Sequence, residues 1–154
     1  MKKYFLLTTI ISVLFSCAKT DGVNSDDNTG NESRFLQKFN GVVWVGDESS
    51  VDDSYYLSFY NSPKSYNYWE VDTDGYYCFP TIFDKVNEDA DTVFIKEENE
   101  LNLLLSIHSE SGVTSNYKFT VLDNGSTLKS EFIEANGDRE IEYWTKSSAI
   151  DPCK

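Results

Sequence analysis

The sequence predicts an all-β domain, an up-and-down antiparallel meander of eight or nine strands that closes into a barrel, with a short helix ahead of it. From Val42 onward apolar residues recur with a period of two, which is typical of strands with one buried face. Clusters of Gly, Asn, Asp and Ser interrupt these runs at the spacing of hairpin turns. No later segment sustains a long amphipathic helical pattern. Hairpin-linked strands favour a barrel, because closure removes exposed sheet edges.

The first residues have the parts of an export signal in the correct order. A Lys-Lys start is followed by an apolar run, Tyr4–Phe15, that is too short to span a bilayer. The run ends in Leu14-Phe15-Ser16-Cys17, which resembles the lipobox of bacterial lipoproteins, with a small residue ahead of the lipidated cysteine. The resemblance implies removal of residues 1–16 and a lipid anchor on Cys17. The alternatives are a secretory signal near an unrelated cysteine, or an apolar core segment.

The residues after Cys17 indicate where the anchored protein resides. Ala18 stands where an aspartate would favour the inner membrane, so we expect the outer membrane of a Gram-negative cell envelope. Two or three acyl chains anchor a protein without a spanning segment. Residues 17–34 are dominated by small polar side chains and predict a disordered tether. Residues 35–154 then form one domain with its own core.

The chain is strongly acidic. It has 13 Lys plus Arg against 26 Asp plus Glu, and removal of Lys2 and Lys3 with the signal leaves a formal charge of −15. Such a surface repels phosphate backbones, so we expect no nucleic-acid partner. The charge either keeps a tethered domain soluble or favours cationic and neutral partners.

Lipidation of Cys17 leaves two thiols, Cys78 and Cys153, in a compartment that permits disulfides. We expect them to pair and to tie the C-terminal tail to a central strand, which stabilises the fold by about 4 kcal/mol in the loop-entropy model. The alternative is two unpaired, partly buried cysteines. Because His108 is the only histidine, the chain lacks the ligands of a zinc site.

A short helix is expected ahead of the first strand. Phe35, Leu36 and Phe39 share a helical face within residues 33–39, and Asn40-Gly41 provides a stop. The strands are expected at Val42–Gly46, Tyr55–Tyr60, Tyr66–Asp72, Tyr76–Phe83, Thr92–Lys96, Leu101–Ile107, Ser115–Val121, Thr127–Ile133 and Arg139–Lys146. The turns between them include Asn61-Ser62-Pro63, Asp74-Gly75, Glu97-Glu98-Asn99, Glu110-Ser111-Gly112, Asp123-Asn124-Gly125 and Asn136-Gly137-Asp138.

Alternation indicates which side chains of the later strands face the interior. The inward set is Leu101, Leu103, Leu105, Ile107, Tyr117, Phe119, Val121, Leu128, Phe132, Ile141 and Tyr143. Their polar neighbours, among them Glu140 and Glu142 of the last strand, are expected on the opposite face. Each of these strands therefore offers one apolar face to a common core.

Several short segments are similar to those of bacterial lipocalin-like lipoproteins. They are Phe39-Asn40-Gly41-Val42-Val43-Trp44, Tyr117-Lys118-Phe119-Thr120-Val121-Leu122, Thr127-Leu128-Lys129 and the closing Tyr143-Trp144. The resemblance covers most of residues 35–146. It implies a lipocalin-like barrel, and it bears on fold more than on activity.

Tyrosines and tryptophans crowd into the first strands and are the candidates for ligand contact. If the apolar set Leu57, Phe59, Trp69 and Val71 points inward, the opposite face carries Tyr56, Tyr60, Tyr66 and Tyr68. That face suits stacking on sugars or other neutral rings. The residues expected first at a ligand are Trp44, Trp69 and Tyr77. The alternative is that the tyrosines only stabilise hairpins through cross-strand pairs.

The sequence shows no constellation for catalysis or metal binding. The acidic stretches Asp72–Gly75 and Asp84–Asp91 offer oxygen ligands for calcium but lack the pattern of an EF-hand loop, so solvated turns explain them more simply. His108 has serines beside it, but none stands in a nucleophile-elbow motif, and we expect His108 to face water at a strand end. We therefore expect no enzyme, no metal and no cofactor.

Together these features predict a lipid-anchored lipocalin-like domain that binds a small hydrophobic or neutral ring-bearing ligand at one open end. One rival hypothesis is an interaction or assembly subunit of an outer-membrane complex, with the tyrosine face against an envelope protein. Another is an accessory carbohydrate binder.

Overall fold

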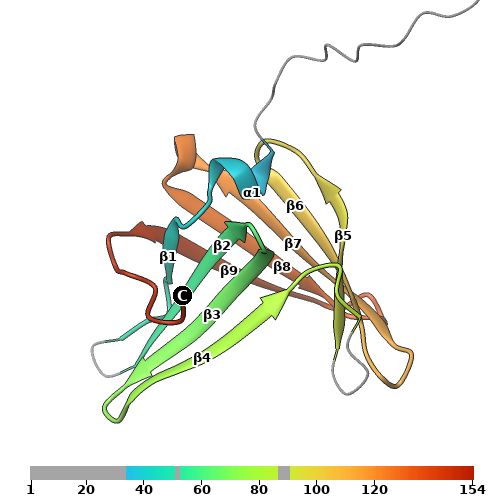
Figure 1. Ribbon diagram of the computed structural model, residues 1–154, viewed down its shortest axis with the longest axis horizontal. Coiled ribbons are helices and arrows are strands. Elements are labelled where there is room, and N and C mark those ends of the chain that lie inside the picture. The colour runs from blue at the N-terminus through green and yellow to red at the C-terminus, as the bar shows by residue number, and fades with distance from the viewer. Residues whose placement is uncertain (1–33, 51–52, 87–90) are drawn as a thin grey trace, which may run out of the picture.

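The predicted all-β architecture is confirmed by the computed structural model, which describes residues 34–50, 53–86 and 91–154 (Figure 1). The signal peptide, Cys17 and the tether up to residue 33 lie outside the described residues. The described elements are the helix α1 (Phe35–Lys38), the strands β1 (Val43–Gly46), β2 (Ser54–Asn61), β3 (Lys64–Asp72), β4 (Gly75–Ile82), β5 (Thr92–Glu98), β6 (Asn102–His108), β7 (Thr114–Leu122), β8 (Thr127–Ile133) and β9 (Arg139–Ser147), and the 3₁₀ turn η1 (Asp123–Gly125). The bounds agree closely with expectation, because the turn residues that interrupt the alternation also end the strands.

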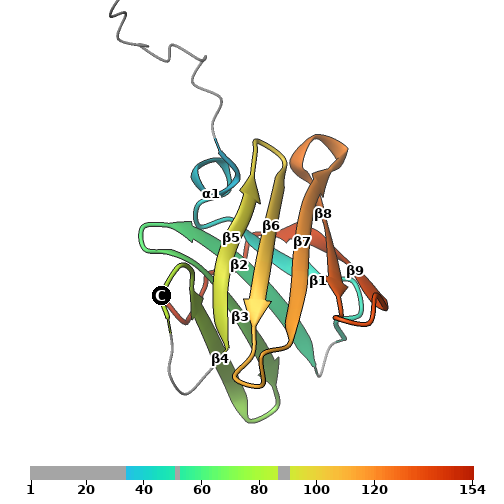
Figure 2. The ribbon, with the colours of Figure 1, turned by 90° about the vertical axis from the view of Figure 1, so that its right-hand side faces the viewer.

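All nine described strands belong to one antiparallel sheet in the order β4-β3-β2-β1-β9-β8-β7-β6-β5. The pairing of β1 with β9 joins the two ends of the meander in the middle of the sheet. The strands β4 and β5 are its two edges, so the curl is that of a half-barrel and full closure is not reached. The half that contains β1 to β4 crosses behind the half that contains β5 to β8 (Figure 2).

The core lies between the single turn of α1 and the inner face of the sheet. Phe59 of β2 stands at its centre, with its ring centroid 5.1 Å from that of Phe35 and 4.9 Å from that of Phe119. The other core side chains are Leu36, Phe39, Trp44, Leu57, Phe83, Val93, Leu103, Leu105, Val121, Leu128 and Trp144. Two bonds hold α1 at the end of β5: the Phe35 N–H donates to Asn99 O (2.8 Å), and the Leu36 N–H donates to Glu98 Oε1 (2.9 Å).

The last strand faces the opposite way from the prediction. Trp144 of β9 is buried in the core, so alternation turns Glu140 and Glu142 toward the interior. Ile141 and Tyr143, expected inside, are 48% and 46% exposed. The prediction is wrong because the indole of Trp144 is buried in the core. Since side chains alternate along a strand, the orientation of Trp144 fixes the orientation of every other residue in β9.

The register of β2 and β3 also divides the four tyrosines that were expected to share a face. Phe59 points to the core as expected, and its ladder partner Tyr66 points with it, as does Tyr68. Trp69 therefore faces outward, where its ring stacks on that of Tyr56 at 5.2 Å and 9°. The prediction of an inward Trp69 is wrong, because alternation within β3 does not reveal which partner in β2 each residue meets.

The predicted disulfide between Cys78 and Cys153 is present, with the two Cα atoms 5.8 Å apart. It ties the C-terminal tail to β4 across a sequence separation of 75 residues. Since β4 is an edge of the sheet, the expectation that the tail is tied to a central strand is wrong. The Lys154 ammonium lies 5.0 Å from the centroid of the Tyr60 ring. The tail is thereby held against the outer face of the sheet.

Asp151 is the polar anchor of this tail. Its Oδ2 accepts hydrogen bonds from the Tyr60 hydroxyl (2.6 Å), the Ser58 hydroxyl (2.7 Å) and the Asn67 amide (2.8 Å). Burial opposes ionisation of Asp151, but these hydrogen bonds outweigh it and lower the pKa of the carboxyl. Burial, and then the bond to Asp151, raises the pKa of Tyr60 to about 12.

Candidate functional site

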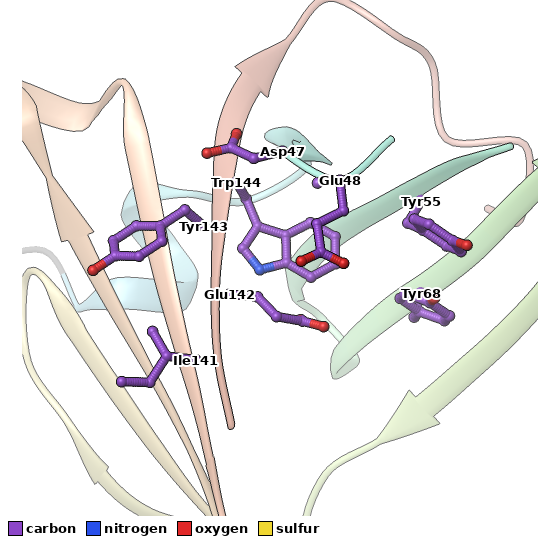
Figure 3. A pocket seen from close by; sticks show the side chains of 9 residues that line it. Asp47, Glu48, Tyr55, Tyr68, Ile141, Glu142, Tyr143 and Trp144 are labelled. Carbon is purple, nitrogen blue, oxygen red and sulfur yellow. The ribbon is translucent and has the colours of Figure 1, made fainter. Parts of the chain in front are cut away.

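A cavity of about 280 Å³ opens where β1 ends. The strand β1 has four residues, whereas its neighbours β2 and β9 have eight and nine. After Gly46 the chain leaves the sheet, and the Asp47 N–H donates to Tyr143 O (2.9 Å). We call this opening in the sheet wall the notch, and its lining consists of Gly46, Asp47, Glu48, Tyr55, Tyr68, Ile141, Glu142, Tyr143 and Trp144 (Figure 3).

Aromatic rings form two walls of the notch. Tyr55 and Tyr68 stand on one side and Trp144 on the other (Figure 3). The ring centroids of Tyr68 and Trp144 are 6.4 Å apart, with the rings nearly perpendicular. The Trp144 indole N–H donates to the buried Ser130 Oγ (2.9 Å), which fixes the ring. Gly46 lies between the walls, since a Cβ there would be 3.5 Å from the Trp144 ring and 3.7 Å from Tyr55 Cβ.

The hydroxyl groups of both wall tyrosines are already bonded at the rim. Tyr55 donates to Asp53 Oδ2 (2.9 Å), and Tyr68 donates to Glu70 Oε1 (3.0 Å). The hydrogen bond to Asp53 raises the pKa of Tyr55, and burial followed by the bond to Glu70 raises the pKa of Tyr68. Both side chains therefore stay neutral at physiological pH and offer the cavity their rings.

Three carboxylates line the notch, from Asp47, Glu48 and Glu142, and none of its described lining residues is a lysine or arginine. The Ser130 hydroxyl donates to Glu142 Oε2 at 3.5 Å. Partial desolvation raises the pKa of Glu142, and the charges of Glu48 and Glu140 raise it further. The notch is thus a walled, negatively charged cavity.

A smaller hollow of about 180 Å³ adjoins the notch at Glu142. It is lined by Tyr117, Ser130, Phe132 and Glu140 together with Glu142. The Tyr117 ring lies 5.9 Å from that of Phe132, and burial raises the pKa of Tyr117. The carboxylate of Glu142 is therefore shared between two spaces along the inner face of β8 and β9.

Two larger hollows lie elsewhere. One of about 710 Å³ lies between α1 and η1, and its charged lining includes the ion pair of Lys38 with Glu100. Another of about 550 Å³ lies between the sheet edges β4 and β5, with Ile82, Val93 and Ile107 in its lining. The notch differs from both because, among the described residues, three carboxylates and several rings line it and no lysine or arginine does.

Seven side chains were predicted to contact a ligand, and Tyr68 is the one that lines the notch. Trp44 is fully buried in the core, with its ring 6.0 Å from that of Phe39. Tyr66 packs 5.7 Å from Phe83. These two aromatic side chains stabilise the interior.

The other four lie away from the notch. Tyr56 and Trp69 stack on each other on the outer face, where Trp69 is 2% exposed. Tyr60 is covered by the C-terminal tail. Tyr77 is 50% exposed on the edge strand β4. Cross-strand stacking explains the positions of Tyr56 and Trp69, and cover by the C-terminal tail explains that of Tyr60.

Sequence reasoning missed Tyr55, Glu142 and Trp144 as members of one site. Glu142 is expected on the polar face, and Trp144 enters only through the family resemblance. The available signal is the shortness of the first predicted strand beside a long last strand, because unequal neighbours leave a gap in a sheet.

The remaining candidates lie in a turn and at a strand end. Asp72 Oδ1 accepts the Asp74 N–H (2.7 Å), so the acidic stretch is closed by its own backbone. Residues 87–90 of the second acidic stretch lie outside the described part. His108 is exposed at the end of β6 as predicted, with Nε2 3.1 Å from Ser106 Oγ. Among the described residues, no three His, Cys, Asp or Glu side chains are placed to hold a metal ion.

Comparisons of the chain with protein-family models, with curated proteins and with solved structures find no significant match. Within the ranges that the structure describes, no helix has the length and apolar character needed to cross a membrane. The geometry of the notch is therefore the basis for a functional assignment.

Proposed function

We propose that this protein is a lipid-anchored envelope protein that binds a small ring-bearing ligand in the notch. The observation that carries the proposal is a cavity with fixed aromatic walls at a place where a longer β1 would have closed the sheet. Burial of a ring against Tyr68 and Trp144 would supply affinity, and the carboxylates would fix its orientation. The lipobox-like end of the signal, Leu14 to Cys17, supports a position at the outer membrane.

Native mass spectrometry of the full chain, extracted from membranes in detergent, tests ligand binding. We expect a retained small molecule in the wild type and its loss in Gly46→Leu, whose side chain enters the space between Trp144 and Tyr55. Tyr76→Ser, on the exposed strand β4, is the matched control and should keep the ligand. Tryptophan fluorescence during titration with ring compounds and soluble glycans gives a second measurement. No retained molecule and no quenching across the panel would refute the proposal.

The anchor has its own test in the Cys17→Ser variant. The wild type should incorporate radiolabelled palmitate and sediment with membranes, and the variant should do neither. Equal membrane attachment of both would exclude lipidation at Cys17.

A second candidate function is favoured by the edge strand β4. Its exposed large apolar side chains are Tyr76 (57%), Tyr77 (50%), Phe79 (51%) and Ile82 (42%). An exposed aromatic edge can receive a strand from a protein partner, as an assembly subunit of an envelope complex requires. A stoichiometric protein in the same mass spectra, lost in Tyr76→Ser and kept in Gly46→Leu, would favour this function.

A further inference from the structure

None of the three carboxylates of the notch belongs to an ion pair in the described part of the chain. The ion pairs found there are Lys38–Glu100 and Lys129–Glu131, and neither pair lines the notch. Figure 3 shows Glu48 and Glu142 beside Trp144, on the side where Tyr55 and Tyr68 stand. The opening therefore presents carboxylates and rings to the same space.

A carboxylate in a walled cavity is less well hydrated than one on an open surface, and like charges beside it add to the unfavourable energy. Glu142 shows both effects, since desolvation comes first and Glu48 and Glu140 follow in raising its pKa. A neutral ligand would displace water and leave these carboxylates still less hydrated. A ligand with a positive charge would relieve the repulsion instead.

The aromatic walls favour a cation for a separate reason. The face of an indole or phenol ring carries negative potential, and it attracts an organic cation within about 6 Å of the ring centroid. Trp144 and Tyr68 pack edge to face with centroids 6.4 Å apart, so no ligand lies between them, but a group in the corner that the two rings form contacts both. Both the rings and the carboxylates thus select the same sign of charge.

We propose that the ligand of the notch is a small organic cation, an amine or quaternary ammonium group carried on an apolar body. This inference rests on the proposed function, because it names the charge of the ligand at the same site. The cationic group would lie between Glu142 and the rings of Tyr68 and Trp144. A metal ion fits less well, because no three ligating side chains converge in the described residues.

Matched probe pairs test the sign of the charge. Choline and 3,3-dimethyl-1-butanol share a shape and differ by the positive nitrogen, and 2-phenylethylamine and 2-phenylethanol form a second pair. The full chain in detergent is titrated with each probe, and the Trp144 indole N–H is followed by NMR. We expect each cation to bind at least about tenfold more tightly than its neutral partner.

Three outcomes separate this inference from the proposed function. Tighter binding of both cations supports the inference. Equal binding within each pair overturns it and leaves a ligand site in the notch. If the Trp144 signal responds to none of the probes, the inference of a cationic ligand is wrong. This result also counts against the notch as a ligand site.

Charge-removing variants test the named residues. Glu142→Gln keeps the shape of the side chain and should lower choline affinity about tenfold without affecting 3,3-dimethyl-1-butanol. The matched control is Glu110→Gln, which removes the same charge from an exposed turn and should change neither probe. Unchanged choline affinity in Glu142→Gln and in Glu48→Gln would overturn the assignment.

Ring variants test the second contribution. Tyr68→Phe keeps the ring and should retain choline binding, whereas Tyr68→Leu should weaken it several-fold. Far-UV circular dichroism and thermal melting establish that each variant is folded. If Tyr68→Leu does not fold, the comparison of the probe pairs in Glu142→Gln decides the question.

Discussion

The two ends of the interior are built from the same sheet and are filled differently. At the end covered by α1, Phe35, Phe59 and Phe119 are fully buried. The ring centroid of Phe59 lies 5.1 Å from that of Phe35 and 4.9 Å from that of Phe119. At the notch, the rings of Tyr68 and Trp144 line a cavity that carboxylates also line. The difference originates in β1, which ends while its neighbours continue.

This contrast separates the region that holds the fold from the region that is available to a ligand. At the covered end, apolar side chains bury their surface against one another. The notch instead combines a missing length of strand, a glycine and unpaired charges, each of which is unfavourable for stability. Departures of this kind from local folding rules are expected at functional sites.

The largest effect should come from the covered end. Phe59→Ala removes a fully buried ring and should lower the free energy of unfolding by about 3–5 kcal/mol. Urea denaturation followed by circular dichroism measures it. Tyr76→Ala, at a 57% exposed position, is the control and should change it by less than about 0.5 kcal/mol. A loss below about 1 kcal/mol in Phe59→Ala would mean that the contrast between the two ends is false.

The disulfide should stabilise the fold without supporting the notch. Replacing Cys78 and Cys153 by serine should lower the free energy of unfolding by about 4 kcal/mol, because a long loop is released in the unfolded chain. Choline affinity should be unchanged, since the tail lies on the outer face. A parallel loss of affinity would show that the two regions are coupled.

Asp151 should give a smaller, pH-dependent effect. Asp151→Asn should lower the free energy of unfolding at pH 7 by about 1 kcal/mol, allowing for solvent screening at a partly exposed site. The pKa of Asp151 is lowered in the fold, so its stabilisation is present above the ordinary value of 3.8 and is lost as pH falls through the folded pKa. Denaturation curves of the variant and the wild type should therefore differ at neutral pH and coincide at acidic pH.

The smallest effect, of opposite sign, should come from the notch. Glu142 faces Glu48, Glu140, Ser130, Tyr68 and Tyr117. Its raised pKa means that the folded state favours the neutral acid, so this group's stabilising contribution is present below 4.5 and is lost as pH rises through the folded pKa. Glu142→Gln should therefore raise the free energy of unfolding of the ligand-free protein by about 0.3 kcal/mol at pH 7 and leave it unchanged near pH 4. Lower thermal stability of the variant at pH 7 would contradict this.

Local chemistry was sufficient to predict the all-β class, the position of each strand, the short helix and the pairing of Cys78 with Cys153. Alternation and turn residues act over a few neighbours, and each can be recognised within one segment of the chain. The inward side chains of β6, β7 and β8 follow from the same rule, as Leu105, Phe119 and Leu128 show.

The opening beside β1 and the side chains that line it were decided by the tertiary structure. Alternation alone turns Ile141 and Tyr143 inward, and only the packing of Trp144 in the core turns Glu142 toward the inner face of the sheet. The site exists because β1 meets β2 and β9, which are far from each other in sequence, and is too short for both. Pairings of that kind depend on which strands meet in space, and no single segment of the chain encodes them.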